Sequence, residues 1–197
     1  NGLKAGRFLR ASDLGQDTTN GEWKPVLFDS LSNQLVVPNG TMGQRWEEGK
    51  KWNLKLENED GTKINPALSM VEEDYELQTI QFPYFDSKGD GVFKRPIPSR
   101  KIRLSNDQEV YISTVYDLMA SQYGIQRFNH ELEAQSYDDV KSKYTPAWQE
   151  SITGINRGLV IQVAKEFAQN AIDTDGRSMI IMGAGINHWF NSDTIYR

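Results

Sequence analysis

One short stretch of the sequence gathers residue types that bind cofactors: residues 182–189 read Met-Gly-Ala-Gly-Ile-Asn-His-Trp. An apolar run at 178–182, bounded by glycines, predicts a buried strand just before it. In open α/β sheets, ligands bind beyond the carboxyl ends of strands, where glycines let the backbone approach a phosphate or nucleotide. Gly183 and Gly185 match the first two glycines of a dinucleotide-binding fingerprint. An amide, an imidazole and an indole ring follow in the sequence: Asn187, His188 and Trp189.

The glycine pattern alone leaves two interpretations open. The third glycine position of the fingerprint holds His188, and the chain ends before a ribose-binding acid could follow. As a motif for a nicotinamide cofactor the match is therefore weak. A tight turn from strand to helix with polar caps explains the same spacing. The grouped Asn187, His188 and Trp189 favour a ligand-facing loop over a turn.

Other chemistries lack part of their pattern. His130-Glu131 begins a zinc-protease helix, but Ala134 stands where the second histidine is required. Residues 86–91 resemble the start of a calcium loop, but Lys88 occupies a ligand position. No Ser/His/Asp set or phosphate-binding Walker loop can be assembled. We therefore assign no catalytic residue and no metal ligand in this sequence.

Composition narrows the class of protein. The 197 residues include 22 Lys and Arg against 27 Asp and Glu, for a formal net charge of −5 at pH 7. Without a basic stripe, we expect no nucleic-acid partner. Without cysteine, these residues hold no disulfide framework, thiolate zinc site or cysteine-ligated iron–sulfur cluster. No apolar run approaches the roughly 20 residues that span a bilayer, so we expect a soluble segment.

The elements that would position the glycine loop follow a change of pattern near Thr114. Before it, turn dipeptides separate short runs rich in β-branched and aromatic residues, which predict strands at 24–29, 35–37, 52–56, 79–82, 101–104 and 109–113. The turn at 106–108 predicts a hairpin between the last two of these strands.

After Thr114 the spacing becomes helical. Thr114 is predicted to cap a helix that Gly124 ends. Its apolar residues share one face of the helix: Val115, Leu118, Met119 and Tyr123. Ser136, with Asp138 and Asp139 behind it, predicts a second capped start. Thr145-Pro146 predicts a third. The clearest helix runs from Asn156 to about residue 171, with an apolar stripe formed by Leu159, Val160, Val163, Ala164, Phe167, Ala168 and Ala171.

Together these elements predict a mixed α/β fold. Helix, loop, strand and glycine turn form one unit of a parallel, Rossmann-like sheet, whose other strands must come from outside the chain. We expect a lead-in segment at 1–14, a turn-rich, mainly β insertion at 15–113, and a helical and α/β segment at 114–197 that ends in the glycine loop. Because the chain starts at Asn1 without an initiator Met or signal peptide, and stops just past the glycine pattern, we expect a fragment of a larger multidomain subunit.

Ordered blocks along the whole chain resemble the catalytic alpha subunit of membrane-bound respiratory nitrate reductase, a molybdopterin oxidoreductase. They lie at 7–14, 114–118, 136–141, 144–148, 152–154, 176–181 and 183–189, and are densest after Thr114. The resemblance implies two-electron reduction of nitrate to nitrite at a molybdenum bis-(molybdopterin guanine dinucleotide) centre. It also implies an iron–sulfur beta subunit, a quinol-oxidising membrane gamma subunit, and a place on the cytoplasmic side of the membrane, held through the partner subunits.

The same resemblance implies a role for the glycine loop. Gly183, Gly185, Asn187, His188 and Trp189 would lie near a pterin or its dinucleotide. The family's molybdenum ligand and the ligands of its 4Fe-4S cluster would lie elsewhere in the parent subunit, so we expect the chain alone to hold no cofactor and to be inactive. The alternative is a free-standing protein-interaction module without catalytic activity, in which the glycine loop is only a turn.

Overall fold

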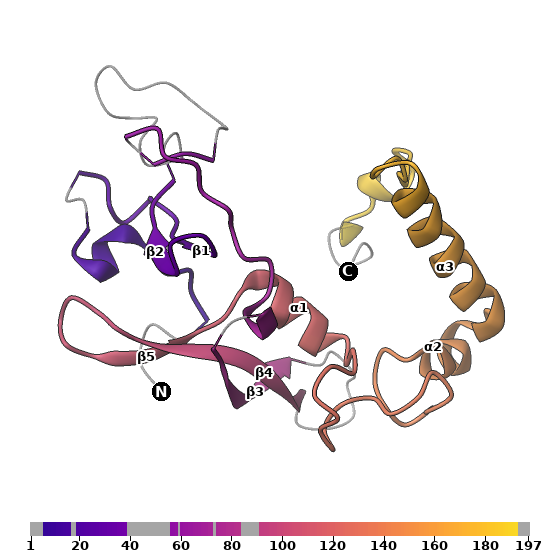
Figure 1. Ribbon diagram of the computed structural model, residues 1–197. Coiled ribbons are helices and arrows are strands. Elements are labelled where there is room, and N and C mark those ends of the chain that lie inside the picture. Colours follow the sequence, from indigo (N-terminus) through magenta and orange to yellow (C-terminus); the bar gives the residue numbers. More distant parts are fainter. Residues whose placement is uncertain are drawn as a thin grey trace. The chain divides into compact units, whose positions relative to one another are not determined.

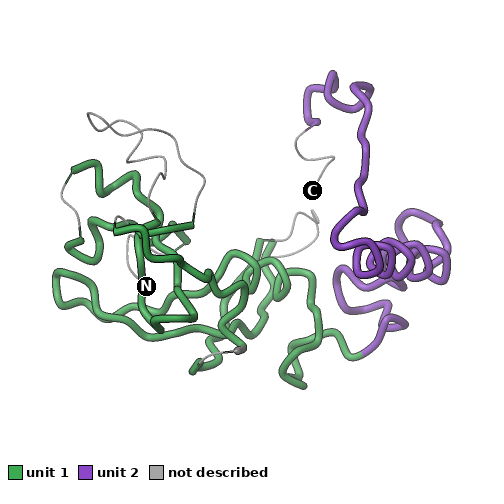
Figure 2. The backbone as a smooth tube through the Cα atoms, turned by 45° about the horizontal axis from the view of Figure 1, so that its top comes forward, with its two compact units in different colours: residues 1–135 green, residues 136–197 purple. Residues whose placement is uncertain are grey.

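The computed structural model divides into two compact units, residues 1–135 and 136–197 (Figure 2). The residues that it describes are 6–16, 19–38, 56–58, 60–72, 74–83 and 91–192. The predicted strand at 52–56 and the turns at 86–91 lie almost entirely outside these ranges.

The described residues of unit 1 form two antiparallel sheets (Figure 1). The smaller pairs β1 (Leu27–Asp29) with β2 (Gln34–Val36). The larger has the order β3-β4-β5, formed by β3 (Glu76–Pro83), β4 (Val92–Arg103) and β5 (Glu109–Ile112). Two short 3-10 helices, η1 (Ala11–Leu14) and η3 (Met70–Glu72), and one α-helix, α1 (Val115–Gln122), complete the unit's described elements. Its buried apolar residues include Phe28, Ile64, Met70, Phe82, Ile97 and Leu104.

The hairpin predicted at 106–108 is confirmed between β4 and β5. The backbone N–H of Leu104 donates to the carbonyl of Gln108 at 2.9 Å, and the Asn106 side-chain oxygen accepts from the N–H of Gln108 at 3.1 Å. Asp107 takes φ +63°, a left-handed conformation that Asp tolerates better than most residues. The turn chemistry is local, which explains why the sequence alone predicts it.

The first half of β4 was missed because it contains two prolines. Pro96 and Pro98 pair with Thr79 and Leu77 of β3, while β5 pairs with β4 only from Arg100 onward. Proline has no N–H to donate, so it is tolerated where that side of its strand has no neighbouring strand. The side of β4 opposite β3 has no strand partner at these two positions among the described residues. Ser113 donates its hydroxyl to the Pro98 carbonyl at 2.7 Å in place of a strand neighbour. Sequence patterns with prolines at alternate positions argue against a strand, yet here they mark where the third strand stops.

Helix α1 forms where predicted, but its apolar residues face solvent. Thr114 caps it by accepting a hydrogen bond from the N–H of Asp117 at 3.0 Å, and Gly124 follows with φ +70°. The side that α1 buries, however, carries Asp117, Ala120 and Ser121. The residues whose spacing predicted the helix lie on the opposite, exposed side.

Unit 2 is built on α2 (Pro146–Thr153) and α3 (Arg157–Asp173), which contact each other. The cap predicted at Thr145 is confirmed, and Asn156, where the clearest helix is predicted to begin, caps α3. The hydroxyl of Thr145 accepts from the N–H of Trp148 at 3.1 Å, and the side chain of Asn156 accepts from the N–H of Leu159 at 3.2 Å. None of the described helices in the chain is long and apolar enough to cross a membrane.

The helix predicted from Ser136 is wrong. Ser136 Oγ accepts from the N–H of Asp138 at 3.1 Å, and Asp139 Oδ1 accepts from the N–H groups of Lys141 and Ser142 at 2.9 and 3.2 Å. Such side-chain bonds to nearby backbone groups compete with helix formation. The result is a run of turns instead of a helix.

The buried strand predicted at 178–182 does not form in this chain. The segment has no strand assignment, and its side chains are exposed, Met179 by 78% and Ile181 by 83%. A strand needs a neighbour to satisfy its backbone groups, and no described residue pairs with this segment. The described part of the chain is mixed α/β with antiparallel sheets and contains no parallel, Rossmann-like sheet.

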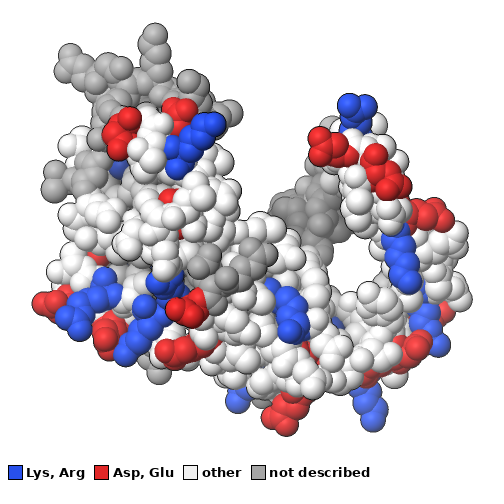
Figure 3. All heavy atoms as spheres, viewed as in Figure 1, with Lys and Arg blue, Asp and Glu red and all other residues white. Residues whose placement is uncertain are grey.

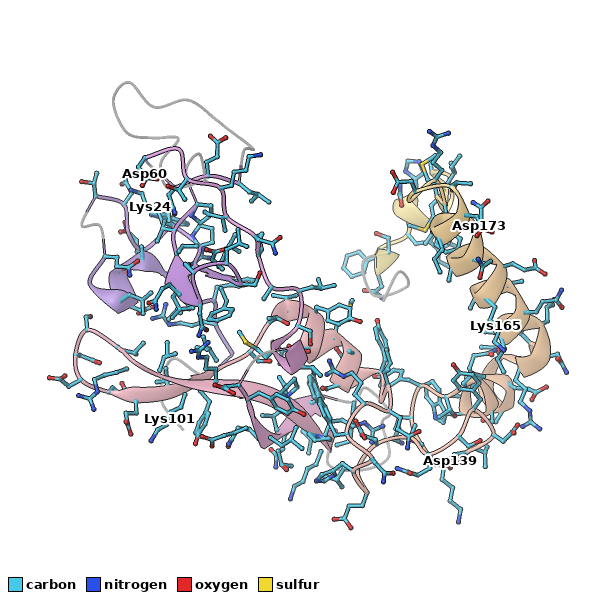
Figure 4. All side chains as sticks on the ribbon, viewed as in Figure 1. Lys24, Asp60, Lys101, Asp139, Lys165 and Asp173 are labelled. Atoms are coloured by element: carbon cyan, nitrogen blue, oxygen red, sulfur yellow. The ribbon has the colours of Figure 1, made fainter. Side chains whose placement is uncertain are left out.

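A charged pair lies across the exposed end of the larger sheet, where Lys101 is drawn in Figure 4. Lys101 Nζ lies 2.6 Å from Glu109 Oε2, and this hydrogen bond lowers the pKa of Glu109 and raises the pKa of Lys101. Because the pKa of Glu109 is lower in the folded than in the unfolded chain, its charged form stabilises the fold at pH values above its unfolded pKa. This stabilisation is lost as the pH falls through the pKa of Glu109 in the folded chain.

Replacing Lys101 with methionine should therefore raise the pKa of Glu109 toward its usual value, because the charged donor is gone. The measurement is a side-chain carboxyl titration by NMR. Lys94→Met is the matched control, because Lys94 is exposed on the other face of β4. An unchanged Glu109 titration in Lys101→Met would contradict the expectation.

Candidate functional site

The glycine loop at 183–189 is positioned by the end of α3. The N–H of Thr174 donates to the carbonyl of Asn170 at 3.0 Å and closes the helix. Asp175 and Gly176 then take φ +55° and +89°, both in the left-handed region. Glycine adopts this conformation without strain, so Gly176 suits the point where the chain reverses.

Two polar side chains tie the segment after the turn to α3. Asn170 Nδ2 donates to the Arg177 carbonyl at 3.2 Å and to Ser178 Oγ at 2.8 Å. The Ser178 hydroxyl in turn donates to the Phe167 carbonyl at 2.8 Å. The beginning of the 178–182 segment is therefore fixed against the last turns of the helix, and the glycine loop follows from this anchor.

The loop itself contains a single 3-10 turn, η4 (Ile186–His188). The N–H of Trp189 donates to the carbonyl of Ile186 at 3.1 Å, and the N–H of Ser192 donates to the carbonyl of Trp189 at 3.1 Å. The predicted amide, imidazole and indole thus lie on one short turn. The turn brings them together as sequence neighbours.

Nothing in the described chain requires glycine at positions 183 and 185. A Cβ added at Gly183 or Gly185 would meet nothing within 4 Å, and neither residue has a positive φ. A glycine is needed where the backbone takes a left-handed conformation or where another group lies against it. Gly183 and Gly185 do not take a left-handed conformation, and no described group lies against either of them.

The loop is exposed, and it is not a closed cofactor site by itself. Trp189 is 69% exposed and Phe190 is completely exposed. Among the described residues, no three His, Cys, Asp or Glu side chains come close enough to hold a metal ion. The loop by itself therefore offers at most one wall for an organic cofactor.

The chemistry that the loop can offer is hydrogen bonding and stacking. His188 is the one titratable side chain at 183–192, and the charged residues of α3 that Figure 4 labels are Lys165 and Asp173. The described carboxylates with a lowered pKa lie in unit 1: Ser32 lowers the pKa of Asp29, and the backbone of Thr62 lowers that of Asp60. Such a loop can orient a ligand, but it holds no acid–base pair.

The similarity to known proteins extends over nearly the whole chain. No family model matches. The chain is 52% identical over 194 residues to the nitrate reductase alpha chain of Bacillus subtilis, and 42% identical over 208 residues to the respiratory nitrate reductase 1 alpha chain of Escherichia coli. It is 42% identical over 205 residues to a nitrate reductase alpha subunit of Mycobacterium tuberculosis.

The chain is homologous to a segment of the nitrate reductase alpha chain. These matches cover 98–99% of the chain but only 16% of each relative. The resemblance stated from the sequence blocks is thereby confirmed. The chain spans about one sixth of the length of the nitrate reductase alpha chains that it matches.

Sequence reasoning missed the residue that anchors the glycine loop. Asn170 lies within α3, where its type and spacing give no sign of a role. Its two hydrogen bonds to residues seven and eight positions later are made only because Gly176 reverses the chain. An amide in the last turn of a helix, followed by a glycine and a serine, is the signal that could have indicated it.

Proposed function

We propose that this chain is part of the catalytic alpha subunit of a nitrate reductase, which reduces nitrate to nitrite. The observation that carries the proposal is the identity of 52% over 194 residues with one such alpha chain. The cofactor would be molybdenum bis-(molybdopterin guanine dinucleotide), which supplies the oxygen-atom chemistry when bound. The described residues contain no metal-binding cluster, so its ligands and those of a 4Fe-4S cluster would come from other parts of the subunit.

Unit 2 would contribute to the cofactor-binding domain as part of a parallel, Rossmann-like sheet. Helix α3 has no buried residue, and its apolar stripe is open, with Leu159, Val163 and Phe167 exposed by 55%, 56% and 42%. The 178–182 segment is apolar, exposed and held along α3 by Asn170. A helix with an exposed apolar stripe, followed by an exposed apolar segment, is what one helix–strand unit of a parallel sheet would look like without its neighbouring strands. Those strands would lie elsewhere in the polypeptide.

The glycine loop would then face a pterin or its guanine dinucleotide. Gly183 and Gly185 have no local need to be glycine, which is the state expected if a large ligand lies against their backbone. Asn187 and His188 would hydrogen-bond the ligand, and Trp189 would offer a flat surface. These residues bind and orient, and no chemical step is assigned to them.

The rest of the complex follows from the same proposal. An iron–sulfur beta subunit would deliver electrons from a quinol-oxidising membrane gamma subunit, and the alpha subunit would lie on the cytoplasmic side of the membrane. Residues 15–113 would be a β-rich insertion in the alpha subunit. Figure 3 shows basic and acidic side chains interspersed on the visible face, which gives no support to a nucleic-acid partner.

The test replaces loop residues in the full-length alpha chain. We expect Gly183→Ala, Asn187→Ala and His188→Ala each to lower the content of bound pterin and the rate of nitrate reduction by about tenfold. This is the effect of losing one neutral hydrogen bond to the ligand, about 1–1.5 kcal/mol. Alanine at 183 is sterically harmless within the described chain, so a loss there reports a group from outside it.

Gln169→Ala is the control, because Gln169 is an exposed amide of α3 that contacts only Asp173 among its described side-chain hydrogen bonds. Unchanged cofactor content and turnover in all three loop variants would remove the glycine loop from the cofactor site. A full-length alpha chain that binds no pterin at all would instead contradict the enzymatic proposal and favour an interaction module.

A further inference from the structure

The chain reverses direction between α3 and the 178–182 segment, and two sets of hydrogen bonds hold this reversal. One set lies in the backbone: the N–H of Gly176 donates to the carbonyl of Ala171 at 2.7 Å, a bond of the type that closes many helices. The other set runs from the side chain of Asn170 through the hydroxyl of Ser178 back to the helix. The backbone bond already closes the turn, so the side-chain bonds fix something beyond it.

We define the Asn170–Ser178 relay as these two side chains together with the carbonyl of Phe167. Asn170 Nδ2 donates to Ser178 Oγ at 2.8 Å and to the Arg177 carbonyl at 3.2 Å, which uses both amide hydrogens. Ser178 Oγ in turn donates its own hydrogen to the Phe167 carbonyl at 2.8 Å. Position 178 must therefore carry a hydroxyl, which accepts from one partner and donates to the other. Arg177 and Met179 have none, so the relay forms in one alignment of the segment only.

The apolar side chains of the segment would not select that alignment by themselves. In a strand, side chains alternate between the two faces of the sheet, so Met179 and Ile181 would share one face, and Ile180 and Met182 the other. Strands of a parallel sheet are buried on both faces. Each face here would bury one methionine and one isoleucine, so a shift by one residue would exchange two equivalent faces. Burial specifies the register of a strand through a difference between its faces, and these four residues supply none.

We propose that Asn170 and Ser178 are positioning residues, which set the register of the 178–182 segment in the sheet of the alpha chain and thereby place the glycine loop at its cofactor. The inference rests on the proposed function, in which this segment is a strand and the loop faces a pterin. Gly183 follows the segment directly, so a shift by one residue would move the loop by about 3.3 Å along the strand. Donor–acceptor distances in hydrogen bonds lie between about 2.7 and 3.2 Å, so contacts from the loop to a ligand would not survive such a shift.

The first test measures hydrogen exchange, by mass spectrometry, at the amides of residues 179–182 in the full-length alpha chain. We expect these amides to be protected in the unmodified chain and to exchange at least about tenfold faster in Asn170→Ala and Ser178→Ala, because either change breaks the relay. Ser178→Thr should keep the unmodified rate, since threonine also carries a hydroxyl and is favoured in strands. Gln169→Ala is the matched control, because it removes the neighbouring amide of α3, which bonds Asp173.

The exchange results separate this inference from the proposed function. Unprotected amides at 179–182 in the unmodified alpha chain would mean that the segment is no strand, which overturns the proposed sheet and this inference with it. Amides that are protected and stay protected in Asn170→Ala and Ser178→Ala would leave the sheet standing and overturn the inference alone. Equally fast exchange in Ser178→Thr and Ser178→Ala would overturn it too, because the hydroxyl would then not be the cause.

A second readout distinguishes positioning from a purely structural role. Alanine is the best helix former, so Asn170→Ala does not weaken α3 itself, and we expect the melting temperature of either alanine variant to change by less than about 2 °C. The pterin bound per folded alpha chain should nevertheless fall by about tenfold in both and return in Ser178→Thr. The double alanine variant should lose no more than either single one, because both changes act on one relay. A lower melting temperature with unchanged pterin content would show that the relay only supports the fold, and would overturn the inference.

Discussion

Asp117→Ala is expected to destabilise unit 1 by about 3–5 kcal/mol, the cost of leaving a buried partner charge uncompensated. The Asp117 side chain has no exposed surface, and Arg127 is 14% exposed. The substitution removes the acceptor for Ser69, Met70 and Arg127 at once. It also removes the carboxylate that accepts from the Thr114 hydroxyl at 2.8 Å, whereas the backbone N–H of residue 117 still donates to Thr114 Oγ1. Urea denaturation followed by circular dichroism measures the loss.

Two variants sharpen this measurement. Asp117→Asn keeps an acceptor oxygen but not the charge, so its cost should fall between those of the native chain and Asp117→Ala. Asp138→Ala removes an acid whose side chain is 73% exposed and pairs with Arg157 at the surface. We expect that control to change the free energy of unfolding by less than about 0.5 kcal/mol. Similar losses for Asp117→Ala and Asp138→Ala would refute the role of the buried network.

Glu133→Ala is expected to open the loop at 124–135 and to cost about 2–4 kcal/mol, because three backbone donors lose their acceptor. Glu133 is 5% exposed, and its carboxylate accepts from the N–H groups of Arg127 at 2.9 Å, Phe128 at 3.1 Å and His130 at 3.0 Å. The ends of this loop meet where the N–H of Ala134 donates to the Gly124 carbonyl at 3.3 Å.

Hydrogen exchange tests this expectation directly. The three amides that Glu133 accepts from should exchange at least about tenfold faster in Glu133→Ala, in proportion to the lost stabilisation. Glu131→Ala is the matched control, since Glu131 is an exposed acid two residues away in the same loop. Slow exchange at Arg127, Phe128 and His130 in Glu133→Ala would show that other contacts hold the loop.

The parts of the fold that the sequence predicted correctly depend on neighbours within a few positions. Thr114, Thr145 and Asn156 each cap a helix by bonding an N–H three residues later. The 106–108 turn likewise closes within its own hairpin. The failure at Ser136 has the same origin, because a local side-chain bond that could cap a helix formed a turn instead.

Burial was decided by residues far apart in the sequence. Asp117 is buried because Ser69 and Met70, 48 and 47 positions earlier, bond to it. Helical spacing identifies which residues share a face, but not whether that face or the opposite one meets the core. The apolar face of α1 is exposed for this reason.

The candidate site divides in the same way. The sequence by itself determined the composition of the glycine loop and the homology with nitrate reductase alpha chains, because both are properties of residue order. Only the tertiary structure decided that Asn170 anchors the segment before the loop and that Gly183 and Gly185 have open space beside them. It also decided that 178–182 forms no strand here, because a strand's backbone bonds require a partner strand that no described residue supplies.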